Sequence, residues 1–310
     1  MVEYMFNKLI IAKYYMEPRQ IFWKTKKIIP GTTWTLSGYS RSRYRSGFFI
    51  SGINIMFDGG PQLFVKPEHV LITHTHGDHI AELPFTLIHK PSKEEDKITV
   101  YRPEEATQYL HDYIIQLHKT NSMREIESKS NEYYNMVQIQ QKKSELRIKI
   151  NNQNILLETV GAFHSIPTVV YGITLIKEKL DPQYSSLSGK ELCALKKSGQ
   201  KITIEVFDKK ICYVLDTSIE ILEKHDFLLE YHVILIECTF LLDDEIEMAI
   251  KKKHIHWMQL KPYVEKYRNN TFILTHFSLR YKDSEIKDFF DKVKKQDNIN
   301  NIIPWLTDTI

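Results

Sequence analysis

The segment Val70-Leu-Ile-Thr-His-Thr-His-Gly-Asp-His-Ile80 gathers three imidazoles and a carboxylate at the end of an apolar run. The apolar start predicts a strand, and the apolar periodicity that follows predicts a helix. Burying so many polar side chains on one connecting loop is costly unless each finds a partner. Histidine nitrogens and aspartate oxygens are good ligands for Zn²⁺. The segment therefore predicts a metal site between a strand and a helix.

The spacing inside this segment favours two adjacent cations over one. His74 and His76 are two residues apart in extended chain, so their side chains point in the same direction. Asp78 and His79 follow where the chain turns, so they can face a second ion. A chance histidine-rich turn would explain neither the number of ligand-type residues nor their spacing.

The stretch His74-Thr-His-Gly-Asp-His79 resembles the metal-binding signature of the metallo-β-lactamase fold. That resemblance implies an α/β architecture of four layers, an αββα sandwich. Two mixed sheets would pack face to face, with helices outside and the metals at one sheet edge. Asp58, in Phe57-Asp-Gly-Gly60, looks like the family's aspartate that orients the metal loop without being a ligand.

The same resemblance implies ligands far along the chain. The full implied set is His74, His76, Asp78, His79, His164, Asp216 and His276. The first ion would take the histidines at 74, 76 and 164. The second would take Asp78, His79 and His276, and Asp216 would bridge the two. Taken singly, His164 and His276 could be core histidines and Asp216 a helix N-cap.

Three further stretches are similar to the tRNase Z (ribonuclease Z) family, and closest to its short, plant-like form. These are Ile80-Ala-Glu-Leu-Pro84, Thr275-His-Phe-Ser-Leu-Arg-Tyr281, and Glu237-Cys-Thr-Phe240 with the following Lys253-His-Ile-His256. The resemblance runs from about Phe49 to Tyr281. It implies an endoribonuclease that hydrolyses precursor tRNA 3′ of the discriminator base and leaves a 3′-hydroxyl on the tRNA.

The implied chemistry suits the residues. Two cations about 3.5–4 Å apart can stabilise the attacking and leaving oxygens and supply hydroxide at neutral pH. We expect two Zn²⁺, although Mn²⁺ or Fe²⁺ would suit the same ligands. Asp78 would orient or deprotonate the nucleophile. By resemblance, His254 would protonate the leaving oxygen and Glu237 would hold its imidazole, with His256 left as an alternative donor.

Two other functions remain open at this stage. One is a small-molecule phosphodiesterase or hydrolase of the same fold, since a fold alone does not fix a substrate. The other is a metal-poor RNA-binding relative, although such relatives usually lose ligands and this chain keeps all seven.

Composition places these motifs in a folded protein. The chain has 310 residues, of which 42% are hydrophobic and 26% charged, and this excludes a mostly disordered chain. No linker divides it, so we expect one domain over residues 1–310. No apolar run reaches the ~18 residues of a membrane span. The N-terminus lacks a signal-peptide shape, and three scattered cysteines suit reducing conditions. We expect an intracellular protein. The cytoplasm is the expected compartment, and the nucleus and an organelle are the alternatives.

The basic charge of the N-terminal region suits a polyanionic partner such as nucleic acid, while a solvated face or a basic edge strand would explain it equally. Residues 1–50 hold nine Lys or Arg against two acids, and Arg41-Ser-Arg-Tyr-Arg45 interleaves arginines with tyrosine. The resemblance implies precursor tRNA as partner, a homodimer, and a tRNA-gripping arm between His164 and Asp216. Here that interval contains a Lys-rich excursion at 177–201 instead of the Gly-Pro-containing arm of many bacterial forms.

Local patterns make several further predictions. Apolar runs predict single strands over Gly47–Phe57, Val169–Ile176, Ile202–Phe207 and Lys210–Leu215. Amphipathic spacing predicts a helix over His79–His89. The polar stretch Thr120–Tyr134 predicts a loop.

Overall fold

Two seven-stranded sheets pack face to face in the computed structural model, which describes residues 22–63, 65–87, 93–94, 97–125 and 133–307. In spatial order, the first sheet contains β1 (Lys26–Ile28), β2 (Thr35–Arg41), β3 (Arg45–Ser51), β4 (Ile55–Phe57), β5 (His69–Leu71), β6 (Ile98–Pro103) and β7 (Tyr134–Ile139). The second sheet contains, in spatial order, β14 (Ile302–Pro304), β13 (Thr271–Thr275), β12 (Val233–Glu237), β11 (Thr203–Val214), β10 (Val169–Leu180), β9 (Gln153–Gly161) and β8 (Ser144–Ile150).

The two sheets are built alike. In the first, β1 to β4 pair antiparallel and β4 to β7 pair parallel. In the second, β8 to β11 pair antiparallel and β11 to β14 pair parallel. Both sheets are thus mixed, as the sequence predicted. Because parallel strands share a direction, their carboxyl ends in each sheet meet at one edge.

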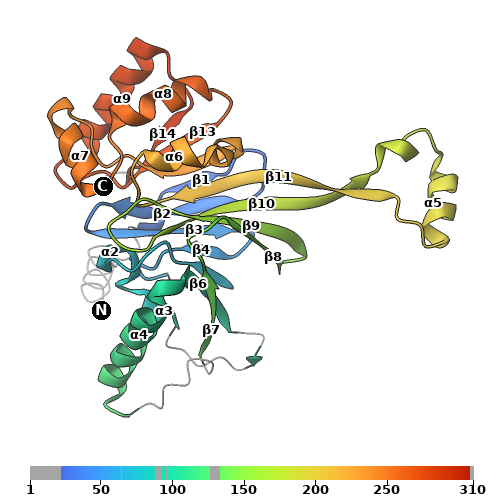
Figure 1. The fold of residues 1–310 in the computed structure, drawn as a ribbon, viewed down its shortest axis with the longest axis horizontal. Coiled ribbons are helices and arrows are strands. Elements are labelled where there is room, and N and C mark those ends of the chain that lie inside the picture. Colours follow the sequence, from blue (N-terminus) through green and yellow to red (C-terminus); the bar gives the residue numbers. More distant parts are fainter. Residues whose placement is uncertain (1–21, 64, 88–92, 95–96, 126–132, 308–310) are drawn as a thin grey trace, which may run out of the picture.

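Helices cover the outer faces of both sheets (Figure 1). The first sheet carries α2 (Gly77–Ile80), α3 (Leu83–Leu87) and α4 (Thr107–Ser122), and the second carries α6 (Glu220–Lys224), α7 (Ile246–Lys252), α8 (Trp257–Lys266) and α9 (Asp283–Asp297). Three apolar clusters fill the interfaces between these four layers. The predicted αββα sandwich is confirmed.

Apolar spacing shows how the helices are fixed to the sheets. In α9, Ile286, Phe290 and Val293 recur every three or four residues and are buried against the second sheet. The helix begins where the Lys282 main-chain N–H donates to the Glu285 carboxylate at 2.7 Å, which satisfies one of the free N–H groups of its first turn. Helix α9 packs beside the loop that follows β13, and this loop carries the last predicted ligand.

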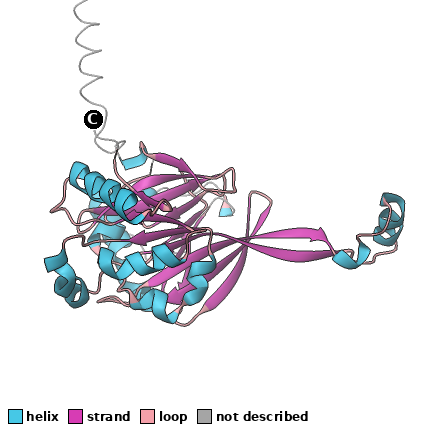
Figure 2. Cartoon of the chain, turned by 90° about the horizontal axis from the view of Figure 1, so that it is seen from above, coloured by secondary structure: helices cyan, strands magenta, loops and turns pink. Residues whose placement is uncertain are grey.

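A long two-stranded arm leaves the body of the molecule (Figures 1 and 2). Strands β10 and β11 stay paired out to Leu180 opposite Thr203. Beyond them lie a short 3-10 turn (Pro182–Tyr184) and the helix α5 (Gly189–Lys197). Reciprocal bonds between Ser188 and Glu191 cap α5. The Lys-rich stretch at 177–201 therefore forms the distal half of the arm.

Two strand predictions on the arm were wrong. β10 extends to Leu180, beyond Ile176, and β11 is one strand rather than two. The two predicted strands left a gap at residues 208–209, but the pairing continues there and shifts from Ile173–Ile211 to Thr174–Lys209. The extra residue is a β-bulge, which bends a strand without ending it.

Other boundaries also differ from the sequence predictions. The stretch Gly47–Phe57 is a hairpin, because Gly52 and Asn54 adopt positive φ angles between β3 and β4. The helix predicted over His79–His89 is broken into α2 and α3, and its last two residues lie outside the described part of the chain. The predicted loop Thr120–Tyr134 is only partly a loop, because its first residues belong to α4 and Tyr134 begins β7. Residues 126–132 of that stretch lie outside the described part of the chain. No helix in the described segments has the length and apolar character of a membrane crossing.

Candidate metal centre

The predicted site residues converge at the edge where the parallel strands end. Asp58 follows β4, the segment His74–His79 follows β5, His164 follows β9, Asp216 follows β11, Glu237 ends β12, and His276 follows β13. Both sheets therefore contribute to one site. Residues more than two hundred positions apart meet because the two sheets pack with these edges together.

His74, His76 and His164 form the first cluster. Nδ1 of His76 lies 3.0 Å from Nε2 of His74 and 3.2 Å from Nε2 of His164. Two nitrogens bound to one Zn²⁺ in tetrahedral geometry are about 3.3 Å apart, from bond lengths near 2.0 Å. Burial lowers the pKa of all three imidazoles, which favours the neutral form with a free lone pair. This cluster can hold one cation.

Asp78, His79, His276 and Asp216 form the second cluster. Oδ2 of Asp216 is 3.3 Å from Nε2 of His276 and 3.6 Å from Nε2 of His79. Oδ2 of Asp78 is 3.8 Å and 3.7 Å from the same nitrogens. Asp216 also lies 3.9 Å from Nε2 of His74, between the clusters. A carboxylate at this position would be within reach of both clusters.

Buried atoms without a partner support a cation here. Among the described residues, Nε2 of His79, Nε2 of His276 and Oδ1 of Asp216 are buried and make no hydrogen bond. Such groups are rare in folded proteins because each forfeits its bonds to water. The two imidazole nitrogens both face Oδ2 of Asp216, around the space a second ion would fill. The donor set is the nitrogen and oxygen set of a divalent-cation site, and the residues fit the group.

The charges of the site also suit a cation. Burial alone would lower the pKa of His79, but Asp216 and Asp58 raise it well above its usual value. For Asp216, burial acts to raise the pKa, yet His276 and His79 hold it well below the ordinary range. For Asp78, burial acts to raise the pKa, but the neighbouring imidazoles of His276 and His79 lower it to about 2. Both carboxylates are thus ionised, as ligands of a cation are, and a bound cation would take the place of the proton on His79.

Asp58 organises the ligands on the first sheet. Its Oδ2 accepts from Nδ1 of His79 at 2.8 Å and from the Tyr213 hydroxyl at 2.9 Å. Its carboxylate also accepts from the main chain and hydroxyl of Thr73, whose oxygen lies 2.9 Å from Nδ1 of His74. Asp58 therefore orients His79 directly and His74 through Thr73. We call this arrangement the Asp58 hub.

Glu237 plays the equivalent part on the second sheet. Both of its carboxylate oxygens lie 3.1 Å from Nδ1 of His254. Its Oε2 also accepts from the Thr239 hydroxyl at 2.6 Å, and that hydroxyl lies 3.0 Å from Nδ1 of His276. Main-chain N–H groups of Thr217 and Ile255 complete its shell. We call this arrangement the Glu237 hub.

The two candidate proton donors differ clearly. His254 lies on the loop between α7 and α8, with its ring centroid 5.2 Å from that of His164 and 5.4 Å from that of His276. Burial would lower its pKa, but Glu237 raises it to about 9. His256 is fully buried; its Nδ1 accepts from Met258 N–H and its Nε2 donates to the Leu242 carbonyl. His256 therefore caps α8, and His254 faces the metal ligands.

Several supporting residues escaped the sequence analysis. Thr73 directly precedes the predicted ligand His74, and Thr239 lies two residues after Glu237. Their closeness to these residues in the sequence was the signal that could have identified them. Lys253 adopts a positive φ, and its carbonyl and Nζ contact Nδ1 and the carbonyl of His164. Tyr213 reaches Asp58 from the opposite sheet. Nothing in the local sequence marks these last two.

The basic stretch Arg41-Ser-Arg-Tyr-Arg45, which joins β2 to β3, has a partly structural role. Arg41 is buried and bonds to Asp283 at 2.7 Å and to the Ser278 carbonyl. Arg41 is therefore not available to contact RNA. The main-chain N–H of Arg43 donates to Oδ2 of Asp78 at 2.9 Å, so this turn supports the metal loop. Of the other basic residues in 1–50, Lys8, Lys13 and Arg19 lie outside the described residues.

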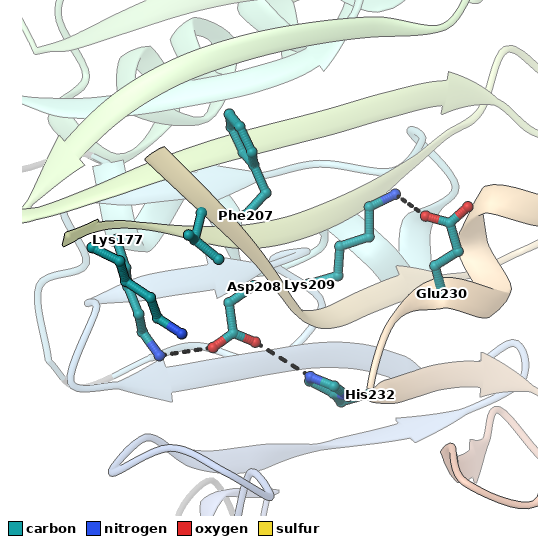
Figure 3. Close-up of a pocket in the computed structure, with 8 residues that line it drawn as sticks. Lys177, Phe207, Asp208, Lys209, Glu230 and His232 are labelled. Atoms are coloured by element: carbon teal, nitrogen blue, oxygen red, sulfur yellow. Dashed lines mark hydrogen bonds and ion pairs between the residues drawn. The ribbon is translucent and has the colours of Figure 1, made fainter. Parts of the chain in front are cut away.

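A pocket of about 490 Å³ lies at the base of the arm, at the opposite strand ends (Figure 3). It is lined by Lys177, Lys179, Val206, Phe207, Asp208, Lys209, Glu230 and His232. Asp208 bonds to Lys177 at 2.7 Å and lies 3.3 Å from His232, while Lys209 pairs with Glu230 at 2.8 Å. Most of its charges thus neutralise one another, and the pocket belongs to the anchorage of the arm.

Comparison with known proteins agrees with this geometry. No protein-family model matches the chain. A tRNase Z of Arabidopsis thaliana is 26% identical over 268 residues, which cover 85% of this chain and 92% of the relative. The sequence expectation of a tRNase Z-like chain of the short, plant-like form is confirmed.

Solved structures agree on the fold. The short form of human tRNase Z superposes with a TM-score of 0.50 at 17% identity, over 78% of this chain and 92% of that one. The metallo-β-lactamase-fold protein YhfI of Bacillus subtilis gives a TM-score of 0.54 at 12% identity, over 88% and 95%. The chain has the metallo-β-lactamase fold.

Proposed function

We propose that this metallo-β-lactamase-fold relative of tRNase Z is a tRNA 3′-processing endoribonuclease. It would hydrolyse the phosphodiester 3′ of the discriminator base in precursor tRNA and leave a 3′-hydroxyl on the tRNA. The observation that carries the proposal is the meeting of two donor clusters with a Glu237-held imidazole at one edge. The similarity to the Arabidopsis tRNase Z supports the choice of substrate.

The ligand assignments follow the two clusters. His74, His76 and His164 would hold the first ion. Asp78, His79 and His276 would hold the second, and Asp216 would lie between them. We favour two Zn²⁺, with Mn²⁺ or Fe²⁺ as substitutes. When bound, such a pair neutralises the charge that develops on the scissile phosphate and lowers the pKa of a water at the site.

Asp78 and His254 would carry out the proton chemistry of the chain. The main-chain N–H of Arg43 fixes one oxygen of Asp78, so the carboxylate is positioned to accept a hydrogen bond from the attacking water. His254 would donate its Nε2 proton to the leaving 3′-oxygen, while Glu237 fixes the ring through Nδ1. General acid catalysis of this kind contributes about 10²–10⁴-fold.

The arm would bind tRNA away from the cut. Lys190, Lys196 and Lys197 are exposed on α5 at its tip. Phosphate contacts of this kind supply affinity that falls with salt. We propose a single domain with the arm as an excursion, acting as a homodimer in the cytoplasm, where the arm of one subunit would serve tRNA bound at the other.

The test is cleavage of a 3′-extended precursor tRNA by zinc- or manganese-loaded protein, with the cut mapped to the nucleotide. We expect one cut next to the discriminator base, absent in Asp78→Ala protein that is folded. Metal-loaded protein that leaves precursor tRNA intact but hydrolyses small phosphodiesters would overturn the proposal in favour of a small-molecule enzyme.

A further inference from the structure

The Thr239 hydroxyl joins the Glu237 carboxylate to the His276 imidazole. Its Oγ1 lies 2.6 Å from Oε2 of Glu237 and 3.0 Å from Nδ1 of His276, and the residue is 2% exposed. A hydroxyl has one proton to give, and an ionised carboxylate can only accept. The Thr239 proton therefore goes to Glu237, and the Thr239 oxygen accepts the Nδ1–H of His276.

This assignment fixes the tautomer of His276. With its proton on Nδ1, the ring keeps its lone pair on Nε2, the buried atom that has no hydrogen-bond partner. That atom faces Oδ2 of Asp216 at 3.3 Å and Oδ2 of Asp78 at 3.8 Å. A ring rotated about its bond to Cβ would lose both the Thr239 contact and this direction.

We propose that Thr239 is a positioning residue that holds Nε2 of His276 in the second donor cluster and shares its hydroxyl with the carboxylate that holds His254. One hydroxyl would thus set a metal ligand and the proposed proton donor together. The metal-binding half of this inference stands on the donor cluster alone, and only the catalytic half rests on the proposed function.

A valine at 239 keeps the shape of the side chain and removes the hydroxyl. It would leave Nδ1 of His276 without a hydrogen-bond partner and remove one of the hydrogen bonds to Oε2 of Glu237, which keeps the N–H of Ile255. A serine would restore both lost bonds. Loss of an outer-shell partner typically costs about 10–100-fold in metal affinity or activity. The Thr239→Val and Thr239→Ser pair therefore separates hydrogen bonding from packing.

Thr174 offers a matched control. It is also a fully buried threonine, and its hydroxyl donates to the Glu158 carboxylate at 3.0 Å. Glu158 and Thr174 lie near the pocket end of the second sheet, away from the donor clusters. Thr174→Val therefore removes the same kind of buried bond without touching a metal ligand.

The experiment measures zinc per chain by elemental analysis after dialysis against a graded series of chelator concentrations, for wild type and the three variants. Circular dichroism confirms folding. We expect Thr239→Val to release its more weakly held zinc at about 10–100-fold lower chelator concentration than wild type. Thr239→Ser and Thr174→Val should follow the wild-type curve, apart from lower thermal stability in Thr174→Val. On precursor tRNA, Thr239→Val should lower kcat and leave KM unchanged.

A wild-type release curve for Thr239→Val would overturn the inference, as would equal losses in Thr239→Ser or Thr174→Val. Failure of the proposed function gives a different pattern. If wild-type protein does not cut precursor tRNA while Thr239→Val alone loses zinc, the endonuclease proposal fails and the role of Thr239 stands.

Discussion

The Asp58 hub and the Glu237 hub have the same construction at the ends of β4 and β12, which belong to opposite sheets. Each buried carboxylate holds one imidazole directly and a second through a threonine hydroxyl. The two differ in the imidazole held directly. That of His79 is fully buried and directs Nε2 into a donor cluster, whereas that of His254 is 13% exposed at the rim. One arrangement can thus serve metal binding on one sheet and proton transfer on the other.

Removing a metal ligand should have the largest effect, because it removes a contact to the metal itself, whereas the hubs only orient such ligands. We expect His76→Ala and Asp78→Ala to lower turnover of precursor tRNA by about 10³-fold or more, since metal ions contribute several kcal/mol to such reactions. Both proteins should remain folded by circular dichroism. If both variants unfold, the metals are chiefly structural. The assignment of metal binding to one hub and proton transfer to the other would then fail.

Substitutions of the two hub carboxylates should have the next largest effects, and these effects should differ in kind. Glu237→Gln should lose about 10²–10⁴-fold in kcat, the usual contribution of a general acid, and should lose less metal affinity than Asp58→Asn, because only one of the two imidazoles it holds is a proposed ligand. Asp58→Asn should instead lose metal affinity by about 10–100-fold, because its carboxylate orients two ligands. Elemental analysis beside single-turnover kinetics makes the comparison. Equal metal loss in both variants would mean that the two hubs do the same work.

The pH profile sharpens the contrast between the two directly held imidazoles. Glu237 raises the pKa of His254 to about 9, so its proton is present below that pH and lost as pH rises through it. We expect kcat to fall above about pH 9. His254→Asn should be slower and should lack that alkaline limb. A limb that persists in His254→Asn would assign it to another group.

The arm, which lies outside both hubs, should give the smallest effect. We expect Lys196→Ala with Lys197→Ala to weaken precursor binding several-fold, leave kcat unchanged and reduce the salt slope by one to two, because each phosphate contact contributes about 0.9. Filter binding at several salt concentrations measures this. A matched double substitution of Lys292 and Lys294, exposed or half-exposed on α9, should leave binding unchanged.

The sequence was sufficient to predict the site where the residue types are themselves typical metal ligands. His74, His76, Asp78 and His79 are unusual together in six positions, and the predicted architecture and donor clusters are present in the structure. It was insufficient where the chemistry is ordinary. Thr73 and Thr239 are common at strand ends, and only the three-dimensional arrangement shows that each hydroxyl lies between a carboxylate and an imidazole.

The arm was misjudged for a similar reason. The predicted strands ended at Phe207 and resumed at Lys210, because the apolar run is interrupted by charged residues there. The structure satisfies them within the strand, since Asp208 pairs with both Lys177 and Lys210 at 2.7 Å. Tertiary ion pairs thus stabilise a strand that local pattern would end.

Strand β11 belongs to two parts of the molecule at once. Its first residues form the outer arm below α5, and its last residue lies two positions before Asp216. Twelve residues of strand span roughly 40 Å at about 3.3 Å per residue. One continuous strand, bent at its bulge, therefore connects the arm to the metal centre, and its length sets how far the arm reaches. Its length would change by a fixed step with every pair of residues inserted into or deleted from β10 and β11.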